Sequence, residues 1–178
     1  MKRASVLVGF VLAAALVSQA GAGHLVVRDE QERRGRLDIR RVEMVGETNA
    51  RWNIVTFPGW TIREIFDRGY FLVFLDTFGS DRHDYYALVR ATRGKLRAML
   101  MRDRADKRDY RVARLGVRKL DRRSIRLFVP HRHMRFSSAQ LTYNWYVQTL
   151  FTKKGKCSRV CFDLAPDLGG VEEPMPQD

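Results

Sequence analysis

Apolar and polar residues alternate with a period of two through most of this chain, which is the pattern of half-buried β-strands. Only residues 61–68 look briefly helical, because their apolar positions fall on one side of a helix. Strands spaced about ten to fifteen residues apart are typical of an all-β fold, and we expect an antiparallel β-sandwich, jelly-roll or immunoglobulin-like, with about eight strands. The segments expected to form strands are 37–44, 52–57, 70–75, 85–91, 96–100, 110–117, 124–129 and 141–151.

Three segments carry more specific expectations. The apolar positions of residues 37–44 share one face only if a bulge at Arg40-Arg41 absorbs one residue. Residues 70–75 are apolar on both faces, as a central strand would be. Arg93-Gly94 separates two alternating segments, which predicts a hairpin with a short loop.

The first residues have the order of a secretory signal. Lys2-Arg3 precedes an apolar run over residues 6–17, and small residues follow up to Ala22. This order predicts a signal peptide over residues 1–22 with cleavage after Ala22. The run is shorter than the about 20 residues that span a bilayer, so we expect a secreted protein without a transmembrane segment after cleavage. An uncleaved anchor is the alternative.

The rest of the chain has the length of one domain. We expect residues 23–166 to form the β-sandwich, and residues 167–178, where Gly, Pro and acidic residues are frequent, to form a flexible acidic tail. The only cysteines are Cys157 and Cys161, and thiols oxidise outside the cytoplasm. We therefore expect a disulfide between them, as a local staple near the C-terminus.

A strand ends in Leu75-Asp76-Thr77, Asp84-Tyr85 opens the next strand, and Trp145 lies in the last one. This order resembles the extracellular sandwiches grouped as DOMON-like domains and family 9 carbohydrate-binding modules. The closing motif Cys157-x-x-x-Cys161-Phe-Asp163-x-Ala-Pro166-Asp167 is similar to the end of uncharacterised secreted proteins of high-GC Gram-positive bacteria. The resemblance implies a module that recognises sugars or, in some relatives, haem, often with a structural calcium.

The chain departs from this family in its tryptophans, because the sugar clamps of the carbohydrate-binding modules use paired exposed aromatics. Trp52 and Trp145 are in register with apolar neighbours, so we expect both in the core. Only Trp60, which follows Pro58-Gly59, is expected on a loop where a ligand can reach it.

The chain is basic, with 33 Lys and Arg against 20 Asp and Glu and a formal net charge of +13. Outside the cell, such a domain attracts anionic or carbohydrate polymers of the cell envelope, whereas a specific nucleic acid is not expected as a partner. Codon usage in a GC-rich genome is the alternative reason for the many arginines.

Arginines lie on the polar face of three expected strands. Arg90, Arg97 and Arg126 occupy these positions, with Tyr86 among them. If the strands are neighbours in one sheet, the guanidinium groups form a cationic stripe suited to carboxylates or phosphates. If the strands lie in different sheets, the arginines only face solvent. Together with Trp60, these four residues are the expected ligand-binding residues.

Two groups of residues have the chemistry of metal ligands. Asp76, Asp81 and Asp84 fall in and beside one turn, where carboxylates suit a hard cation such as Ca²⁺. The spacing matches no EF-hand, and turn formation by the aspartates themselves is the alternative. His131 and His133 would face one side of an extended backbone, a geometry for Cu²⁺ or Zn²⁺, and a solvated loop pair is the alternative. Beyond a structural calcium, we expect no cofactor.

Catalysis has little to build on in this sequence. There is no Gly-x-Ser-x-Gly motif and no cysteine outside the expected disulfide. We therefore expect a non-catalytic module that binds a carbohydrate or anionic polymer. The alternative is a structural domain that docks on a protein, which a large apolar surface patch would favour. An enzyme or a haem-binding redox domain is a further alternative, and the oligomeric state is left open.

Overall fold

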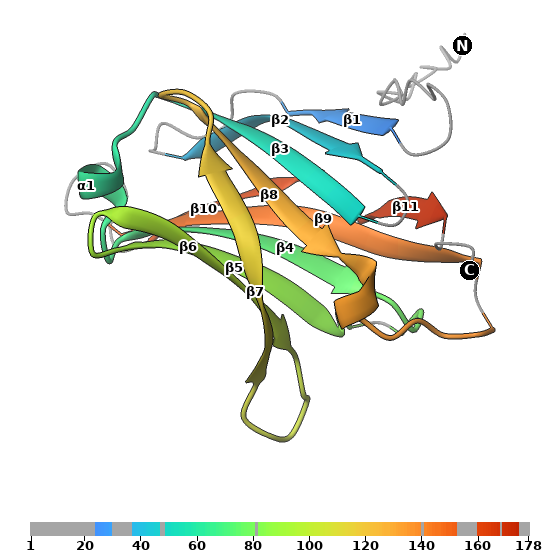
Figure 1. Ribbon diagram of the computed structural model, residues 1–178. Helices are drawn as coiled ribbons and strands as arrows, with labels where there is room; N and C mark the ends of the chain where they lie inside the picture. Colours follow the sequence, from blue (N-terminus) through green and yellow to red (C-terminus); the bar gives the residue numbers. More distant parts are fainter. Residues whose placement is uncertain are drawn as a thin grey trace, which may run out of the picture.

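The structure, a computed structural model, describes residues 24–29, 37–46, 49–80, 82–139, 141–152, 160–167 and 169–174. These residues form two packed layers of β-strands (Figure 1). The expected signal peptide, residues 1–22, lies outside them, and so does Cys157. Export and the disulfide therefore stay predictions.

Eleven strands and two short helical segments make up the described residues. The strands are β1 (His24–Arg28), β2 (Asp38–Val45), β3 (Asn49–Phe57), β4 (Gly69–Asp76), β5 (Tyr85–Thr92), β6 (Lys95–Arg102), β7 (Tyr110–Lys119), β8 (Ser124–Pro130), β9 (Thr142–Phe151), β10 (Cys161–Ala165) and β11 (Val171–Pro174). The helical segments are α1 (Ile62–Ile65) and the 3₁₀ turn η1 (His131–His133).

The strands pair in one continuous antiparallel order, β1-β2-β3-β8-β7-β6-β5-β4-β9-β10, and β11 also pairs with β9. β7 changes partner along its length, because residues 110–115 pair with β6 and residues 116–119 pair with β8. It thereby joins a first layer (β1, β2, β3 and β8) to a second layer (β4, β5, β6, β9, β10 and β11). At the other end, the backbone N–H of Ile39 in β2 donates to the carboxylate of Asp163 in β10 at 2.6 Å, so the sheet is nearly closed. The predicted antiparallel all-β fold is confirmed.

The core lies between the two layers. Trp52 of β3 and Trp145 of β9 are fully buried and meet edge to face, with ring centroids 6.1 Å apart. This confirms that both are core residues. The predicted bulge is also present, because the register of β2 against β3 shifts between Ile39 and Arg41, and the apolar residues on both sides of the shift are buried.

Local sequence signals explain several elements. Arg93 and Gly94 have φ angles of 46° and 74°, the left-handed pair that a two-residue hairpin loop between β5 and β6 requires. Thr61 caps α1 and exchanges hydrogen bonds with Glu64. β4 lies between β5 and β9, the central position predicted from its two apolar faces. Among the described residues, no helix has the length and apolar character needed to cross a membrane.

The strand number and the tail differ from expectation. The strands beyond the expected eight include β1, β10 and β11, which have five, five and four residues, too few for an alternation to stand out. β11 corrects the prediction of a flexible tail, because residues 171–174 pair with residues 142–145 of β9 and Glu173 is buried. The neighbouring strand orders this segment in spite of its acidic composition.

Candidate functional site

The outer face of the second layer carries a cluster of aromatic side chains. Phe74 of β4 lies directly opposite Tyr86 of β5 and Tyr146 of β9 in the strand register. The rings of Phe74 and Tyr146 are stacked, with centroids 4.7 Å apart and 20° between their planes. His83, in the turn before β5, meets the Phe74 ring edge-on at 4.3 Å. We call Phe74, His83, Tyr86 and Tyr146 the aromatic cluster.

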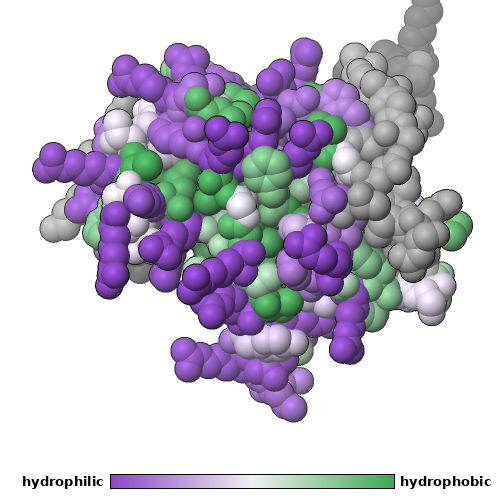
Figure 2. Space-filling model, in the orientation of Figure 1, coloured by the Kyte–Doolittle hydropathy of each residue, from purple (hydrophilic) through white to green (hydrophobic). Residues whose placement is uncertain are grey.

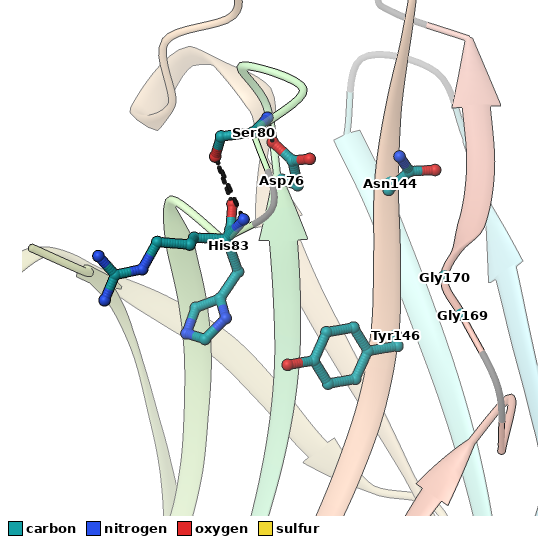
Figure 3. A pocket seen from close by; sticks show the side chains of 8 residues that line it. Asp76, Ser80, His83, Asn144, Tyr146, Gly169 and Gly170 are labelled. Carbon is teal, nitrogen blue, oxygen red and sulfur yellow. Dashed lines mark hydrogen bonds between the residues drawn. The ribbon is translucent and has the colours of Figure 1, made fainter. Parts of the chain in front are cut away.

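A pocket of about 370 Å³ lies beside this cluster. A gap along β9 positions it: residues 147–151 pair with β10 and residues 142–145 pair with β11, so Tyr146 lies between the two partners. Figure 3 shows the Tyr146 side chain directed toward His83, with Asp76 and Asn144 farther along the pocket. The other lining residues are Ser80, Arg82, Gly169 and Gly170.

The turn between β4 and β5 is held by two of the aspartates expected to bind calcium. Asp76 accepts hydrogen bonds from the backbone N–H groups of residues 78–80 through a single carboxylate oxygen, at 2.7–3.2 Å. Asp84 accepts from the N–H groups at the start of the same turn and forms an ion pair with Arg102 at 3.2 Å. Asp81 lies outside the described residues. These contacts are those of the turn-forming alternative, because backbone donors occupy one oxygen of each aspartate and Arg102 pairs with the second oxygen of Asp84.

The side chains of the aromatic cluster carry no charge near pH 7. Burial lowers the pKa of His83, although Asp103, 2.9 Å from its Nε2, acts in the opposite direction. The Tyr86 hydroxyl donates to Asp109 at 2.8 Å, and burial together with this bond raises the pKa of Tyr86 to about 12. Burial also raises the pKa of Tyr146. The cluster therefore offers uncharged aromatic surface beside polar groups.

Four arginines lie on the same outer face, toward its other end. Arg90 of β5 is directly opposite Arg97 of β6, and Arg111 and Arg114 follow on β7. All four side chains are exposed and line a second cavity of about 340 Å³. Within the described residues, no carboxylate forms an ion pair with any of them. We call these four residues the arginine group.

Of the residues expected on one polar face, Arg90, Arg97 and Tyr86 share this outer face, and Arg126 does not. Arg126 belongs to β8 in the first layer, where its Nε donates to the side-chain oxygen of Asn53 at 2.7 Å. The pairing of β8 with β3 and with the far half of β7 puts it on the opposite side of the molecule from Arg90. Alternation along the chain could not tell which strands are neighbours.

Trp60 is not the exposed loop residue that was expected. Its side chain is 1% exposed, packs against Phe71 with ring centroids 5.5 Å apart, and donates its indole N–H to Thr56 at 3.0 Å. The Nζ of Lys119 lies 3.8 Å from the ring centroid. Trp60 is therefore a core residue, and the prediction that it binds a ligand is wrong.

The histidine pair is also arranged differently from expectation. His131 and His133 lie in the 3₁₀ turn η1 and not on an extended backbone. His131 is buried, and its Nε2 lies 3.3 Å from the hydroxyl of Tyr143. The two imidazoles therefore do not share one open face.

Three other carboxylates approach each other where β10 meets the N-terminal strands. Asp29, Asp163 and Asp167 each place one oxygen within 4.8 Å of the others. Burial raises the pKa of Asp163 to about 6, and the nearby carboxylates of Asp38 and Asp167 act in the same direction.

Sequence reasoning missed Phe74, His83 and Tyr146. A signal existed for two of them, because period-two alternation places Phe74 and Tyr146 on the outward face of their strands, where large aromatics are uncommon. No pattern in the sequence indicated His83, because its contact with Phe74 depends on the path of the turn before β5.

Comparison with known proteins found no relative of this chain. No family model matches the chain, no curated protein matches it, and no solved structure matches it. The resemblance to DOMON-like domains and family 9 carbohydrate-binding modules therefore stays a prediction, and the functional argument depends on the geometry of the outer face of the second layer.

Proposed function

We propose that this protein is a secreted, non-catalytic module that binds a carbohydrate polymer of the cell envelope or extracellular space. The observation that carries the proposal is the stacked pair of Phe74 and Tyr146 at the edge of a 370 Å³ pocket. Sugar rings present an apolar C–H face and a rim of hydroxyl groups. An aromatic ring can pack against the C–H face, and carboxylate, amide and hydroxyl groups can form hydrogen bonds with the hydroxyl groups of the rim.

Residues that line the pocket have polar atoms of this kind that the fold itself does not use. One oxygen of Asp76 is used in the turn, which leaves its other oxygen as an acceptor for a ligand hydroxyl. The amide of Asn144 is exposed and can donate and accept. The aromatic side chains are neutral near pH 7, so they present uncharged ring surface to a ligand.

The arrangement across strands suits a polymer more than a single sugar. The register places Tyr146, Phe74, Tyr86, Met101 and Arg111 side by side on five adjacent strands. At about 4.8 Å between strands, this row is about 19 Å long, enough for several linked sugar units. Its arginine end and the net charge of +13 favour a polymer that carries acidic groups.

The test is retention on a panel of immobilised polysaccharides, neutral and acidic, with and without a chelator. Replacing Tyr146 by Ala removes half of the stacked pair, and we expect about tenfold weaker binding, about 1.4 kcal/mol. Asn144→Ala, at an exposed position, is a second variant with little effect on folding. Tyr110→Ala is the matched control, because Tyr110 is a half-exposed tyrosine outside the pocket.

Equal retention of Tyr146→Ala, Asn144→Ala and Tyr110→Ala would contradict the proposal. So would the failure of the unmodified protein to bind any polysaccharide of the panel.

Docking on a protein partner is a second candidate function, favoured by an apolar row on the same face. Leu88 and Met99 are partly exposed and lie side by side on β5 and β6, between the aromatic and the arginine rows, and Leu72 of β4, which is 9% exposed, lies beside Leu88. Cell envelopes treated with protease or with glycosidases separate the two candidates. Retention that is lost after protease treatment and kept after glycosidase treatment favours docking on a protein.

A further inference from the structure

The second cavity is formed where β7 leaves β6. The two strands pair from Ala98 to Arg102 on the β6 side, and residues 95–97 of β6 extend beyond this ladder. From Gly116 onward, β7 pairs instead with β8 of the other layer. The two strands therefore diverge, and the cavity of about 340 Å³ lies between them. We call this opening between β6 and β7 the wedge.

The floor of this wedge is apolar and continuous with the core. Leu96, Leu115 and Val117 point to the core side of their strands but are only partly buried, and all three line the cavity. Figure 2, which views the side that carries β7, shows hydrophobic surface near its centre with hydrophilic residues around it. Hydrocarbon placed against this floor would leave water, which is favourable in proportion to the apolar area that becomes buried.

The rim of the wedge is cationic and lacks counter-charges. The arginine group surrounds the opening, and in the described part of the chain none of its four guanidinium groups has an ion-pair partner. Arg90 and Arg97 are direct cross-strand neighbours, an arrangement in which like charges destabilise a sheet. An oxyanion between them would convert this repulsion into charge-assisted hydrogen bonds.

We propose that the wedge between β6 and β7 binds an anionic amphiphile. Its carboxylate or phosphate head contacts the arginine group, and its hydrocarbon chain lies against Leu96, Leu115 and Val117. The cavity volume is at the low end of the about 300–1,000 Å³ range of small-molecule pockets, which suits one head group with a short length of chain. This site uses none of the residues that line the pocket at Tyr146 and shares only Arg111 with the row of the proposed function. Binding at the two places can therefore be tested separately.

Calorimetric titration with five probes tests the proposal. Octanoate and octyl phosphate carry both head and chain, acetate and inorganic phosphate carry only the charge, and octyl glucoside carries only the chain. We expect the two charged amphiphiles to bind at least tenfold more tightly than the other three. Comparing octanoate with octyl phosphate identifies which oxyanion the arginines prefer.

Two sets of variants locate the binding. The double replacement R90S/R97S is expected to weaken octanoate binding at least tenfold. R51S/R132S is the matched control, because it makes the same charge change at exposed positions away from the wedge. Leu115→Gln tests the floor, and we expect it to weaken octanoate while leaving acetate unchanged. Circular dichroism and thermal melting confirm that each variant is folded.

Octanoate binding that is equal in R90S/R97S and R51S/R132S would overturn the proposal. Acetate binding as tight as octanoate binding would also overturn it, because the site would then recognise a bare anion. Tyr146→Ala should leave octanoate binding unchanged, so failure of the amphiphile site and failure of the polysaccharide site are separate results.

Discussion

The carboxyl group of Asp163 lies where the second layer meets β2. It accepts the backbone N–H of Ile39 at 2.6 Å, and this bond helps to close the sheet. Burial raises its pKa to about 6, and the carboxylates of Asp38 and Asp167 add to the effect. At neutral pH the protein therefore keeps a charged, partly desolvated group at this junction, at a cost in stability.

We expect the protein to lose stability as the pH rises from about 4 to about 6. The pKa of Asp163 is higher in the folded chain than in the unfolded chain, where it is about 3.9, so the folded state binds the proton more tightly over this interval. The loss is on the order of 1–2 kcal/mol, because solvent screens part of the interaction. Urea denaturation across this pH range measures it.

Asp163→Asn is the control for this prediction, since the amide keeps an acceptor for the Ile39 N–H and cannot ionise. The variant should show a smaller slope of stability against pH between about 4 and 6. An identical slope in both proteins would assign the pH dependence to other groups.

At the scale of elements, the path of β7 shapes the arginine end of the outer face. Its first half extends the second layer and places Arg111 and Arg114 beside β6. Its second half belongs to the first layer, so none of the described strands pairs with the start of β6 on that side. The cross-strand pair of Arg90 and Arg97 lies next to this opening, where it has no described carboxylate partner. Position in the sheet, and not local sequence, makes these arginines a group.

Replacing Arg97 by Glu is expected to stabilise the fold by about 0.5 kcal/mol, because an opposite-charge pair then replaces a like-charge pair across β5 and β6. Denaturation at low salt measures the gain, and high salt should reduce it. Arg97→Gln separates the loss of repulsion from the new attraction. If Arg97→Glu is no more stable than Arg97→Gln at low salt, the two side chains do not interact as inferred.

At the scale of the whole molecule, the aromatic cluster and the arginine group occupy one face of one layer. The aromatic side chains come from β9, β4 and β5 with the turn before it, and the arginines from β5, β6 and β7. Stacking acts at short range, whereas the field of a chain with net charge +13 acts over a Debye length. The two ends of the face should therefore respond differently to salt.

Raising the salt concentration from about 0.05 M to about 1 M is expected to weaken retention on an acidic polysaccharide by more than tenfold, since the Debye length falls from over 10 Å to about 3 Å. Retention on a neutral polysaccharide should change little. Affinity electrophoresis at both salt concentrations measures the difference. Unchanged retention on the acidic polymer would remove the electrostatic contribution and leave stacking alone.

The sequence by itself determined the local features of this protein. Alternation fixed the inward and outward sides of most strands, including the bulge after Ile39, and Arg93-Gly94 determined a hairpin. Trp52 and Trp145 could be assigned to the core because their strand neighbours are apolar. These features depend on residues within a few positions of each other, so the chain carries the information directly.

Only the tertiary structure decided the sites. The gap at Tyr146, the split between β6 and β7, and the ordering of β11 each depend on strands that are distant in the sequence. Burial of Trp60 depends on Phe71 and Lys119, which belong to other elements. Period-two alternation says which face a side chain occupies but not which strand lies beside it. For that physical reason, Arg90 and Arg97 share a surface and Arg126 does not.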